Sequence, residues 1–181
     1  PGVAELAEGK VSIGDLREVN IKDLLGRDVV EPNKELLGKS ITNKIVVVTG
    51  AGGSIGSELC RQIVSLKPKT LILYEMSELS LYTIEKELSN ISFHSIDIYP
   101  VLGSVNNKTR LAYVFKRFRV DTIYHSAAYK HVPMVEFNNT EGIDNNIFGT
   151  LNCAQVAIDT GVETFVLIST DKAVRPTNTM G

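Results

Sequence analysis

The chain ends in a stretch that places three proton-handling side chains side by side. The sequence STDKA, which holds Thr170, Asp171 and Lys172, directly follows an apolar run. A hydroxyl, a carboxylate and an amine at a strand end favour general acid–base chemistry, provided that the strand end faces a substrate. In an arbitrary loop, Asp171 and Lys172 would instead form a solvated surface pair. The elements that position the loop decide between these two interpretations.

A second stretch with chemical potential, TGAGGSIG, is rich in glycine. Its Gly50, Gly53 and Gly56 fit the GxxGxxG pattern, in which a tight turn lets backbone N–H groups approach a pyrophosphate at a helix N-terminus. An apolar run precedes it and a helical pattern follows, so we expect dinucleotide binding rather than a turn that binds nothing. The residues expected to contact the cofactor here are Thr49, Gly50, Gly52, Gly53, Ser54, Ile55 and Gly56.

An acidic residue, Glu75, closes the next apolar run, at about 20 residues beyond the loop. There a carboxylate can hold the adenosine ribose hydroxyls, and it would repel a 2′-phosphate, which favours NAD over NADP. Arg61 in the intervening helix is the counter-argument, because a guanidinium could accept that phosphate, so NADP stays possible. The alternative for Glu75 is a solvated carboxylate at a strand end.

The stretch HSAAYKHVP ends another apolar run. Its small residues Ser126, Ala127 and Ala128 would let a cofactor lie close to the backbone. Lys130 would face the same crevice, where it could meet a phosphate or a sugar hydroxyl, and His131 lies beside it on the substrate side. His125 and His131 lack a third ligand at suitable spacing, so we expect packing or loop roles for them and no metal site.

Strand and helix patterns alternate along the chain and would bring these stretches together. Short apolar runs rich in β-branched residues predict buried strands, and apolar residues every three or four positions predict amphipathic helices. With right-handed crossovers, this alternation predicts an α/β, Rossmann-like, doubly wound parallel sheet with its ligands at the carboxyl ends of the strands. The expected strands are residues 44–50, 70–74, 93–99, 121–127 and 164–169, and the expected helices are residues 54–67, 77–89, 107–118 and a long helix within 139–161.

Local signals mark some of these elements more closely. Ser77 has the residue type of an N-cap, and Gly161 that of a helix end. The basic positions of residues 107–118 alternate with apolar ones, which indicates an amphipathic helix with a charged outer face rather than a nucleic-acid site. The first helix is expected to bury Ile55, Leu59, Ile63 and Leu66.

Two segments follow from composition. Residues 1–40 are polar and broken by glycine and proline, so we interpret them as an N-terminal extended arm or linker. Residues 41–181 are predicted to form a Rossmann domain that is C-terminally incomplete, because the chain stops before a substrate-binding lobe could begin. We therefore expect these 181 residues, taken alone, to bind a cofactor at best.

The bulk numbers exclude several classes of protein. A formal net charge of −2 gives no reason to expect nucleic acid or an anionic membrane as a partner. No apolar run approaches the roughly 20 residues of a membrane span. Cys60 and Cys153 fall in helical patterns without metal-ligand spacing, so we expect buried, reduced thiols and a cytoplasmic protein.

Four stretches together resemble a known family: VTGAGGSIGSELCRQI, HSAAYKHVPMVEFN, NNIFGTLN and LISTDKAVRPTNTMG. They are similar to the extended short-chain dehydrogenase/reductase superfamily, and within it to the bacterial capsule and glycan biosynthesis branch of UDP-N-acetylglucosamine 4,6-dehydratases. The upstream IKDLLGRDVV also looks like the segment that precedes the catalytic domain in that branch. The resemblance implies an NAD(P)-dependent hydro-lyase that takes a UDP-sugar. It also implies a homo-oligomer, and a parent protein anchored at the cytoplasmic face of the bacterial inner membrane through a segment absent here.

The resemblance also implies roles for single residues. Thr170, Asp171 and Lys172 match the catalytic cluster, and Asn146 matches the helix asparagine that supports the active-site hydrogen bonds. Met180 matches the position of the usual catalytic tyrosine, where the larger dehydratases of this branch carry methionine. The lysine that follows that tyrosine in the family would lie beyond the last residue of the chain.

One loop departs from the family pattern. The third-strand loop of such proteins usually reads Gly-Asp-Val, with the aspartate accepting a hydrogen bond from the adenine amino group. Here the loop reads Gly103-Ser104-Val105, and a serine hydroxyl accepts less strongly than a carboxylate. Ser104 and Val105 remain the residues expected at the adenine.

The dehydratase reaction requires two proton-handling groups beside the sugar C5 and C6 atoms, because a C5 proton is removed and the C6 hydroxyl leaves as water. Lys172 suits the base at C5, Asp171 the acid at the C6 oxygen, and Thr170 a hydrogen bond near the C4 oxygen. Two alternatives stay open. One is a UDP-sugar 4-epimerase or dehydrogenase, which expels no water. The other is a non-catalytic nucleotide-binding domain, which Met180 and the shortened site favour.

Overall fold

The structure is a computed structural model that describes residues 33–91, 96–176 and 179. The chain divides into two units between Asn33 and Lys34, and the fold below is that of the second unit. Residues 1–32, most of the expected arm, lie outside the described residues. In the part of the chain that the structure describes, no helix is both long and apolar enough to cross a membrane.

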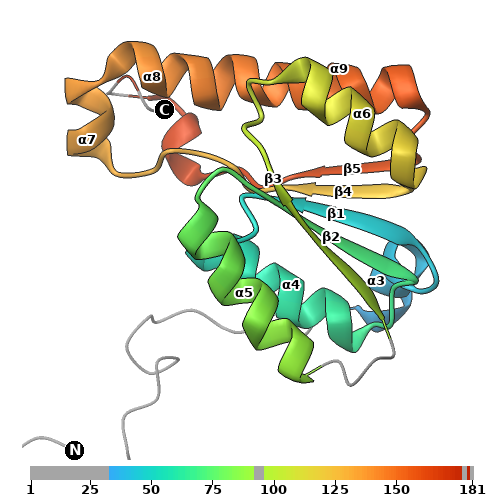
Figure 1. The fold of residues 1–181 in the computed structure, drawn as a ribbon. Helices are drawn as coiled ribbons and strands as arrows, with labels where there is room; N and C mark the ends of the chain where they lie inside the picture. The colour runs from blue at the N-terminus through green and yellow to red at the C-terminus, as the bar shows by residue number, and fades with distance from the viewer. Residues whose placement is uncertain (1–32, 92–95, 177–178, 180–181) are drawn as a thin grey trace, which may run out of the picture. The chain divides into compact units, whose positions relative to one another are not determined.

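Within the described residues, five strands form a parallel sheet in the order β3–β2–β1–β4–β5 (Figure 1). The chain enters at the central strand, builds outward on one side, and then crosses back to build the other side. Neighbouring strands are parallel throughout, which confirms the Rossmann-like doubly wound sheet. The strands are β1 (Ile45–Thr49), β2 (Thr70–Glu75), β3 (Asp97–Leu102), β4 (Thr122–His125) and β5 (Thr164–Leu167).

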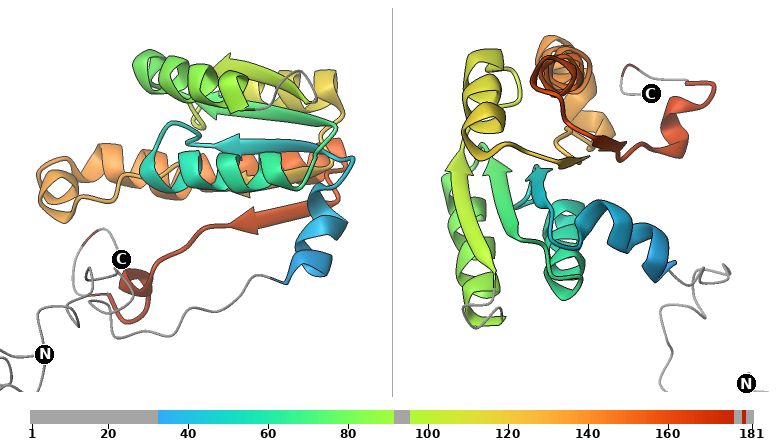
Figure 2. Two further views of the ribbon diagram at one scale, coloured as in Figure 1. Left: turned by 90° about the horizontal axis from the view of Figure 1, so that it is seen from below. Right: turned by 90° about the vertical axis from the view of Figure 1, so that its right-hand side faces the viewer.

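Helices cover both faces of this sheet, as the views in Figure 2 show. One apolar core joins the sheet to α3, α4 and α5 through Ile41, Cys60 and Leu88, and the other joins it to α6 and α9. Because both faces are covered, the β-branched Val46, Val47 and Val48 of β1 have no exposed surface. The helices named here are α3 (Lys34–Ile41), α4 (Ser54–Ser65), α5 (Glu78–Ile91), α6 (Lys108–Phe118) and α9 (Gly149–Thr160).

The strand β3 extends past its expected end, and residues 93–95 of the expected strand lie outside the described residues. The sequence pattern predicts it at residues 93–99, whereas the structure has it at Asp97–Leu102, with Pro100 in register with Leu73. Proline has no N–H to give to a sheet and usually marks a strand end, which is why the expected strand stops before it. An edge strand tolerates proline, and β3 is an edge strand of this sheet.

The apolar face of α4 is also corrected in one position. Ile63 is buried as expected, and Leu59 and Leu66 are partly buried, but Ile55 is 51% exposed. At the start of α4 the buried residues are instead Gly56 and Cys60. The cap at Ser77 is confirmed, since its hydroxyl accepts from the N–H of Ser80.

The compact unit begins at Lys34, whereas residues up to 40 were expected to belong to the arm. Residues 34–41 form α3, which ends on the buried Ile41. The carbonyl oxygen of Ser40 accepts a 2.7 Å hydrogen bond from the hydroxyl of Thr122 at the start of β4. This helix therefore packs with the sheet.

The long helix expected within 139–161 is present, but it changes its winding. It runs as α8 (Asn139–Ile143), a π-helical turn η2 (Asp144–Phe148) and α9, and a short α7 (Val132–Phe137) precedes it. Gly161 ends α9 in the left-handed conformation, with φ of 73°, as its residue type predicted. The wide turn is the part that carries Asn145 and Asn146.

Candidate active site

The glycine loop between β1 and α4 is built for close backbone approach. Gly50 has φ of 67°, and a Cβ added there would lie 2.8 Å from Cα of Ala127. A Cβ at Gly56 would overlap the carbonyl oxygen of Gly50, and one at Gly52 would collide with Ser80. The loop therefore folds tightly on itself and leaves its outer face open.

The first turn of α4 points unpaired donors toward that open face. Its N-cap is Gly53, which has no side chain to bond the first amides. By helix geometry the N–H groups of the first residues have no partner within the helix, and they carry the positive end of the helix dipole. Such a terminus binds anionic groups such as phosphates.

The carboxylate of Glu75 is held in place by backbone amides at the end of β2. Its Oε2 accepts from Gly52 N at 3.0 Å, and its Oε1 accepts from Met76 N and Ser77 N, each at 2.9 Å. The residue is only 8% exposed, so it is not the solvated carboxylate that was the alternative. A carboxylate offers about four acceptor positions, and three are used here.

A first cavity of 360 Å³ opens above these groups at the carboxyl edge of the sheet. It includes the expected Gly50, Gly53, Glu75, Val105, Ala127 and Ala128. Ser126 was expected beside these alanines too. The remaining lining residues come from β2, α5, η2 and the loops between elements, and were not predicted as cofactor contacts. The cavity is lined by Gly50, Gly53, Tyr74, Glu75, Met76, Ser77, Ser80, Gly103, Val105, Ser126, Ala127, Ala128, Tyr129 and Asn145.

A second cavity of 560 Å³ adjoins the first and shares Gly53, Ala128 and Tyr129 with it. The expected substrate-side residues Lys130 and His131 line it, together with Ser54. Its remaining wall comes from α7 and α8, which contribute Met134, Val135, Asn138, Glu141 and Gly142. The structure thus brings the glycine loop and the HSAAYKHVP loop to one pair of connected hollows.

Asn146 fixes the residue that both cavities share. Its Oδ1 accepts from the backbone N–H of Tyr129 at 2.8 Å, and its Nδ2 donates to the carbonyl oxygen of Tyr129 at 2.9 Å. Asn145 donates to the same Oδ1 at 3.1 Å. The hydroxyl of Tyr129 reaches Sδ of Met76 at 3.8 Å, across the mouth of the first cavity.

Thr49 lies beneath the glycine loop and has no exposed surface, so its side chain does not face either cavity. Its hydroxyl is 2.7 Å from Nδ1 of His125, and Nε2 of His125 is 3.0 Å from the hydroxyl of Thr150. Burial lowers the pKa of His125 to about 4, which keeps the imidazole neutral. His125 therefore has the packing role expected of it.

The loop after β3 uses Ser104 within itself. The Ser104 hydroxyl accepts from Asn106 N, and its carbonyl oxygen accepts from the hydroxyl of Tyr74. Burial raises the pKa of Tyr74 to about 12. The neighbours Gly103 and Val105 line the first cavity, whereas Ser104 is absent from its lining.

The segment that holds Thr170, Asp171 and Lys172 begins where β5 ends, at the same edge of the sheet. Residues Asp171–Ala173 form a single 3-10 turn, η3, and the N–H of Lys172 donates to the Thr170 hydroxyl at 3.3 Å. Lys172 is exposed, and neither it nor Thr170 is among the residues that line the two cavities. Met180, the expected counterpart of the tyrosine, lies outside the described residues.

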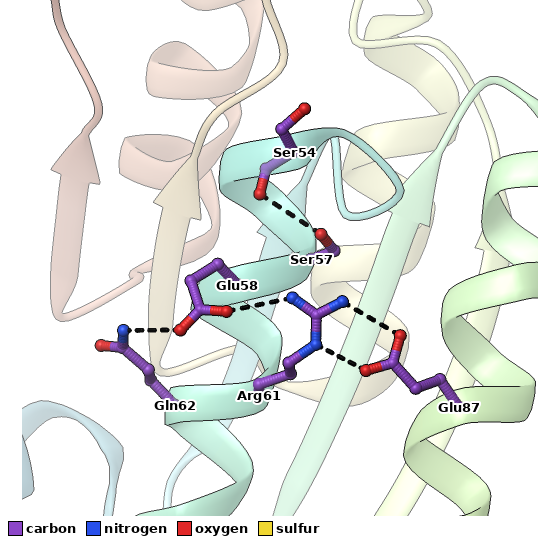
Figure 3. Close-up of polar contacts among 6 residues, drawn as sticks. All are labelled: Ser54, Ser57, Glu58, Arg61, Gln62 and Glu87. Carbon is purple, nitrogen blue, oxygen red and sulfur yellow. Dashed lines mark hydrogen bonds and ion pairs between the residues drawn. The ribbon is translucent and has the colours of Figure 1, made fainter. Parts of the chain in front are cut away.

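Arg61 of α4 is hydrogen-bonded to carboxylates of α4 and α5, as Figure 3 shows. Its Nε and Nη2 donate to Glu87 at 2.5 and 3.0 Å, and its Nη1 donates to Glu58 at 3.0 Å. Hydrogen bonds to these carboxylates, Glu87 first, raise the pKa of Arg61. Its guanidinium is therefore matched by two acidic groups of the protein.

Comparisons with known proteins agree with this architecture. A family model described as polysaccharide biosynthesis protein matches residues 46–181. Capsular polysaccharide biosynthesis protein CapD of Staphylococcus aureus is 46% identical over 181 residues, which cover 100% of this chain and 30% of that protein. An inverting UDP-N-acetylglucosamine 4,6-dehydratase of Campylobacter jejuni is 35% identical over 139 residues, which cover 76% of this chain and 40% of that protein.

Among solved structures, Pen from Bacillus thuringiensis superposes with a TM-score of 0.72 and 30% identity, covering 78% of this chain and 43% of that one. The chain thus spans less than half the length of each of these three proteins. The family match includes every strand of the sheet except the first residue of β1, as well as both loops that line the cavities. The chain belongs to the polysaccharide biosynthesis protein family.

Proposed function

We propose that this chain is the dinucleotide-binding and proton-transfer part of a UDP-N-acetylglucosamine 4,6-dehydratase in bacterial surface polysaccharide biosynthesis. The observation that carries the proposal is the pair of connected cavities at the carboxyl edge of the sheet, one walled by the glycine loop and Glu75 and the other by Lys130 and His131. A redox cofactor and a sugar must lie side by side in such a reaction. The segment Thr170–Lys172 leaves the sheet at that same edge.

The residues of the first cavity fit a nicotinamide dinucleotide. Gly50 and Gly53 line this cavity without side chains, and the amides of the first turn of α4 would bind the pyrophosphate. Glu75 has one acceptor position left for a ribose hydroxyl. When bound, the cofactor would supply reversible hydride transfer, first from C4 of the sugar and later to C6.

We assign NAD rather than NADP on charge. A 2′-phosphate would lie against the carboxylate of Glu75, which is fixed by three backbone amides. The one cation that sequence reasoning offered as its partner, Arg61, is engaged by Glu58 and Glu87. Opposite charges at this distance already satisfy the guanidinium, so it would have to break both ion pairs to serve a phosphate.

The chain's own residues would perform the proton transfers. Lys172 removes the proton from C5, which is acidic beside a C4 ketone, and Asp171 delivers a proton to the C6 oxygen as water leaves. Thr170 donates a hydrogen bond near the C4 oxygen, and Lys130 binds a phosphate or sugar hydroxyl in the second cavity. The methionine side chain at position 180 has no titratable group, so proton transfer is assigned to Asp171 and Lys172.

The names of the relatives support this assignment at two levels. The Staphylococcus relative is named for capsular polysaccharide biosynthesis, and the Campylobacter relative for the 4,6-dehydratase reaction itself. Both are longer than this chain, so a substrate lobe, a homo-oligomeric assembly and attachment at the cytoplasmic face of a membrane are proposals for the whole protein. The free, buried thiols of Cys60 and Cys153 suit a reducing compartment.

The test uses the intact protein that contains this chain, incubated with UDP-N-acetylglucosamine and followed by mass spectrometry. A product lighter by one water supports the dehydratase. A product of unchanged mass with inverted C4 would indicate an epimerase. The absence of any product would indicate a non-catalytic nucleotide-binding domain. Asp171→Asn and Lys172→Ala should each abolish the dehydrated product without weakening NAD binding, and turnover close to wild type in either variant would refute the assigned roles.

A further inference from the structure

Glu136 on α7 ties the end of the chain to the wall of the second cavity. Its Oε1 accepts a 2.7 Å hydrogen bond from the backbone N–H of Thr179, and its Oε2 accepts a 3.3 Å hydrogen bond from the Thr179 hydroxyl. One carboxylate thus receives both donors of a residue that is 43 positions away. Two bonds to one residue restrict its orientation as well as its distance, and bonds to an ionised acceptor are the stronger kind.

The segment that follows β5 is therefore held at two described points. At its start, the N–H of Ile168 donates to the carbonyl oxygen of His125 at 3.0 Å, which continues the pairing of β5 with β4. Near its end, Thr179 is held by Glu136. Thr170 and Lys172 lie between these points, and Thr179 immediately precedes Met180.

The anchor at Glu136 belongs to an element that already shapes the second cavity. The neighbouring Met134 and Val135 line that cavity, and Val135 is buried, so α7 is fixed on the domain. Glu136 itself is exposed and lines neither cavity. Its described polar contacts from the side chain go to Thr179, which leaves the carboxylate without a role in the proposed chemistry itself.

We propose that Glu136 is a positioning residue that holds the Thr170–Lys172 segment in register with the substrate-side cavity. The kinetic consequence of this inference rests on the proposed function. The tether itself, which is the pair of hydrogen bonds between Glu136 and Thr179, does not. Proton transfer tolerates little displacement, since a misplacement of about 1 Å can cost about 100-fold in rate. With the hydrogen bonds to Thr179 lost, the segment would lose its described attachment near its end and keep the hydrogen bond of Ile168 to β4 at its start.

The kinetic test compares variants of the intact protein with UDP-N-acetylglucosamine as substrate. Glu136→Ala should lower kcat by about 10- to 100-fold while changing KM and NAD affinity less than about threefold, because the segment carries proton transfer rather than binding. Glu136→Gln should restore most of kcat, since the carbonyl oxygen of the new side chain can accept from Thr179 N and its amide can donate to the Thr179 hydroxyl. If Glu136→Gln is as slow as Glu136→Ala, the charge and not the tether matters, and the proposal fails.

A double-mutant cycle isolates the contact. Thr179→Val keeps the backbone donor and removes the hydroxyl, so its kcat should lie between wild type and Glu136→Ala. The double variant should be no slower than Glu136→Ala, because the second change removes a bond already lost. The matched control is Glu163→Ala, which removes a carboxylate paired with Lys44 at the opposite end of β5 and should leave kcat unchanged. Additive losses in the double variant would overturn the proposal.

Hydrogen exchange tests the tether without any substrate. The amides of Thr179 and of residues 168–175 should exchange faster in Glu136→Ala than in wild type, and should be unchanged in Glu163→Ala. A wild-type protein that forms no dehydrated product would end the proposed function, yet faster exchange would still support the tether. Unchanged exchange would end the tether even in an active enzyme.

Discussion

Nδ1 of His125 lies 2.7 Å from the hydroxyl of Thr49, so a buried imidazole joins the ends of β1 and β4 directly beneath the glycine loop. Its other nitrogen lies 3.0 Å from the Thr150 hydroxyl on α9. A neutral imidazole has one donor and one acceptor, and two hydroxyls can satisfy both. The floor of the candidate site thus depends on His125 staying uncharged.

The first prediction concerns acid. Burial lowers the pKa of His125 to about 4, from its ordinary value of 6.5. Between pH 4 and pH 6.5, His125 is therefore protonated in the unfolded chain and neutral in the folded chain. Above pH 6.5 His125 is neutral in both states and does not lower the free energy of unfolding. As the pH drops from 6.5 toward 4, the free energy of unfolding falls. The loss attributable to this group is about 3 kcal/mol at most. Urea unfolding at several pH values measures it.

The control for this prediction is His125→Gln, which keeps hydrogen-bonding groups but cannot titrate. Its free energy of unfolding should depend less on pH between 6.5 and 4 than that of the wild type, because the contribution of His125 is removed. The carboxylates are the same in both proteins, so their contribution cancels in the comparison. An imidazole resonance of His125 that titrates near 6.5 in the folded protein would contradict the prediction.

The second prediction concerns the glycine loop. Gly56→Ala places a methyl group on the carbonyl oxygen of Gly50, and backbone atoms cannot move aside as a side chain would. Overpacking of this kind costs about 1–3 kcal/mol, and here it falls on the cofactor cradle. We expect the Kd for NAD to rise at least about tenfold, measured by calorimetry.

Gly38→Ala serves as the comparison, because its added methyl group meets only the Thr42 hydroxyl, at 3.5 Å. Gly38 lies inside α3, where alanine is preferred over glycine by about 1 kcal/mol. This variant should gain stability and bind NAD as the wild type does. NAD affinity that is equally reduced in both variants would show that the loss at Gly56 is not local.

The third prediction concerns cofactor choice. Arg61→Ala should leave the ratio of NAD to NADP affinity unchanged, because Glu87 and Glu58 already occupy the guanidinium. Glu75→Ala should instead narrow that ratio by weakening NAD, and should also lower stability by about 1–3 kcal/mol as buried amides lose their acceptor. Calorimetric titration with NAD and with NADP measures this ratio of affinities. A loss of NADP affinity relative to NAD in Arg61→Ala would contradict the assignment.

Sequence patterns predicted the parts of this fold that local chemistry controls. The runs that became β1, β2, β4 and β5 are short and apolar, the cap at Ser77 and the end at Gly161 depend on single residue types, and the glycine loop depends on sterics. Each of these features is decided within a few residues. For that reason they could be recognised without knowledge of what packs against them.

The features that sequence reasoning missed depend on tertiary contacts. Thr49 belongs to the glycine-loop motif, but its pairing with His125 is made across strands and removes its hydroxyl from the cavity. Ile55 continues the apolar spacing of α4 but is 51% exposed, because no other described element covers it. The register of α8 and α9 is broken by a π-helical turn, whose position is understandable only from the bonds that Asn146 makes to Tyr129.

The fourth prediction concerns Asn146. Its side-chain amide both donates to and accepts from the backbone of Tyr129, whose side chain reaches Met76 and lines both cavities. Asn146→Asp keeps the acceptor but turns a carboxylate oxygen toward the Tyr129 carbonyl, and Asn146→Ala removes both bonds. Each lost bond is worth about 1 kcal/mol, so NAD affinity should fall at least about fivefold in Asn146→Asp and up to about 30-fold in Asn146→Ala.

Tyr129→Phe separates the backbone of Tyr129 from its hydroxyl. It loses the weak 3.8 Å contact to Met76 but keeps both bonds to Asn146, so its NAD affinity should stay within about threefold of wild type. The Tyr129 amide should exchange faster in Asn146→Ala and at the wild-type rate in Tyr129→Phe. Because the two cavities meet at Tyr129, Asn146→Ala should also raise KM for the sugar nucleotide. Unchanged NAD affinity in Asn146→Ala would mean that the backbone of Tyr129 holds its place without the amide.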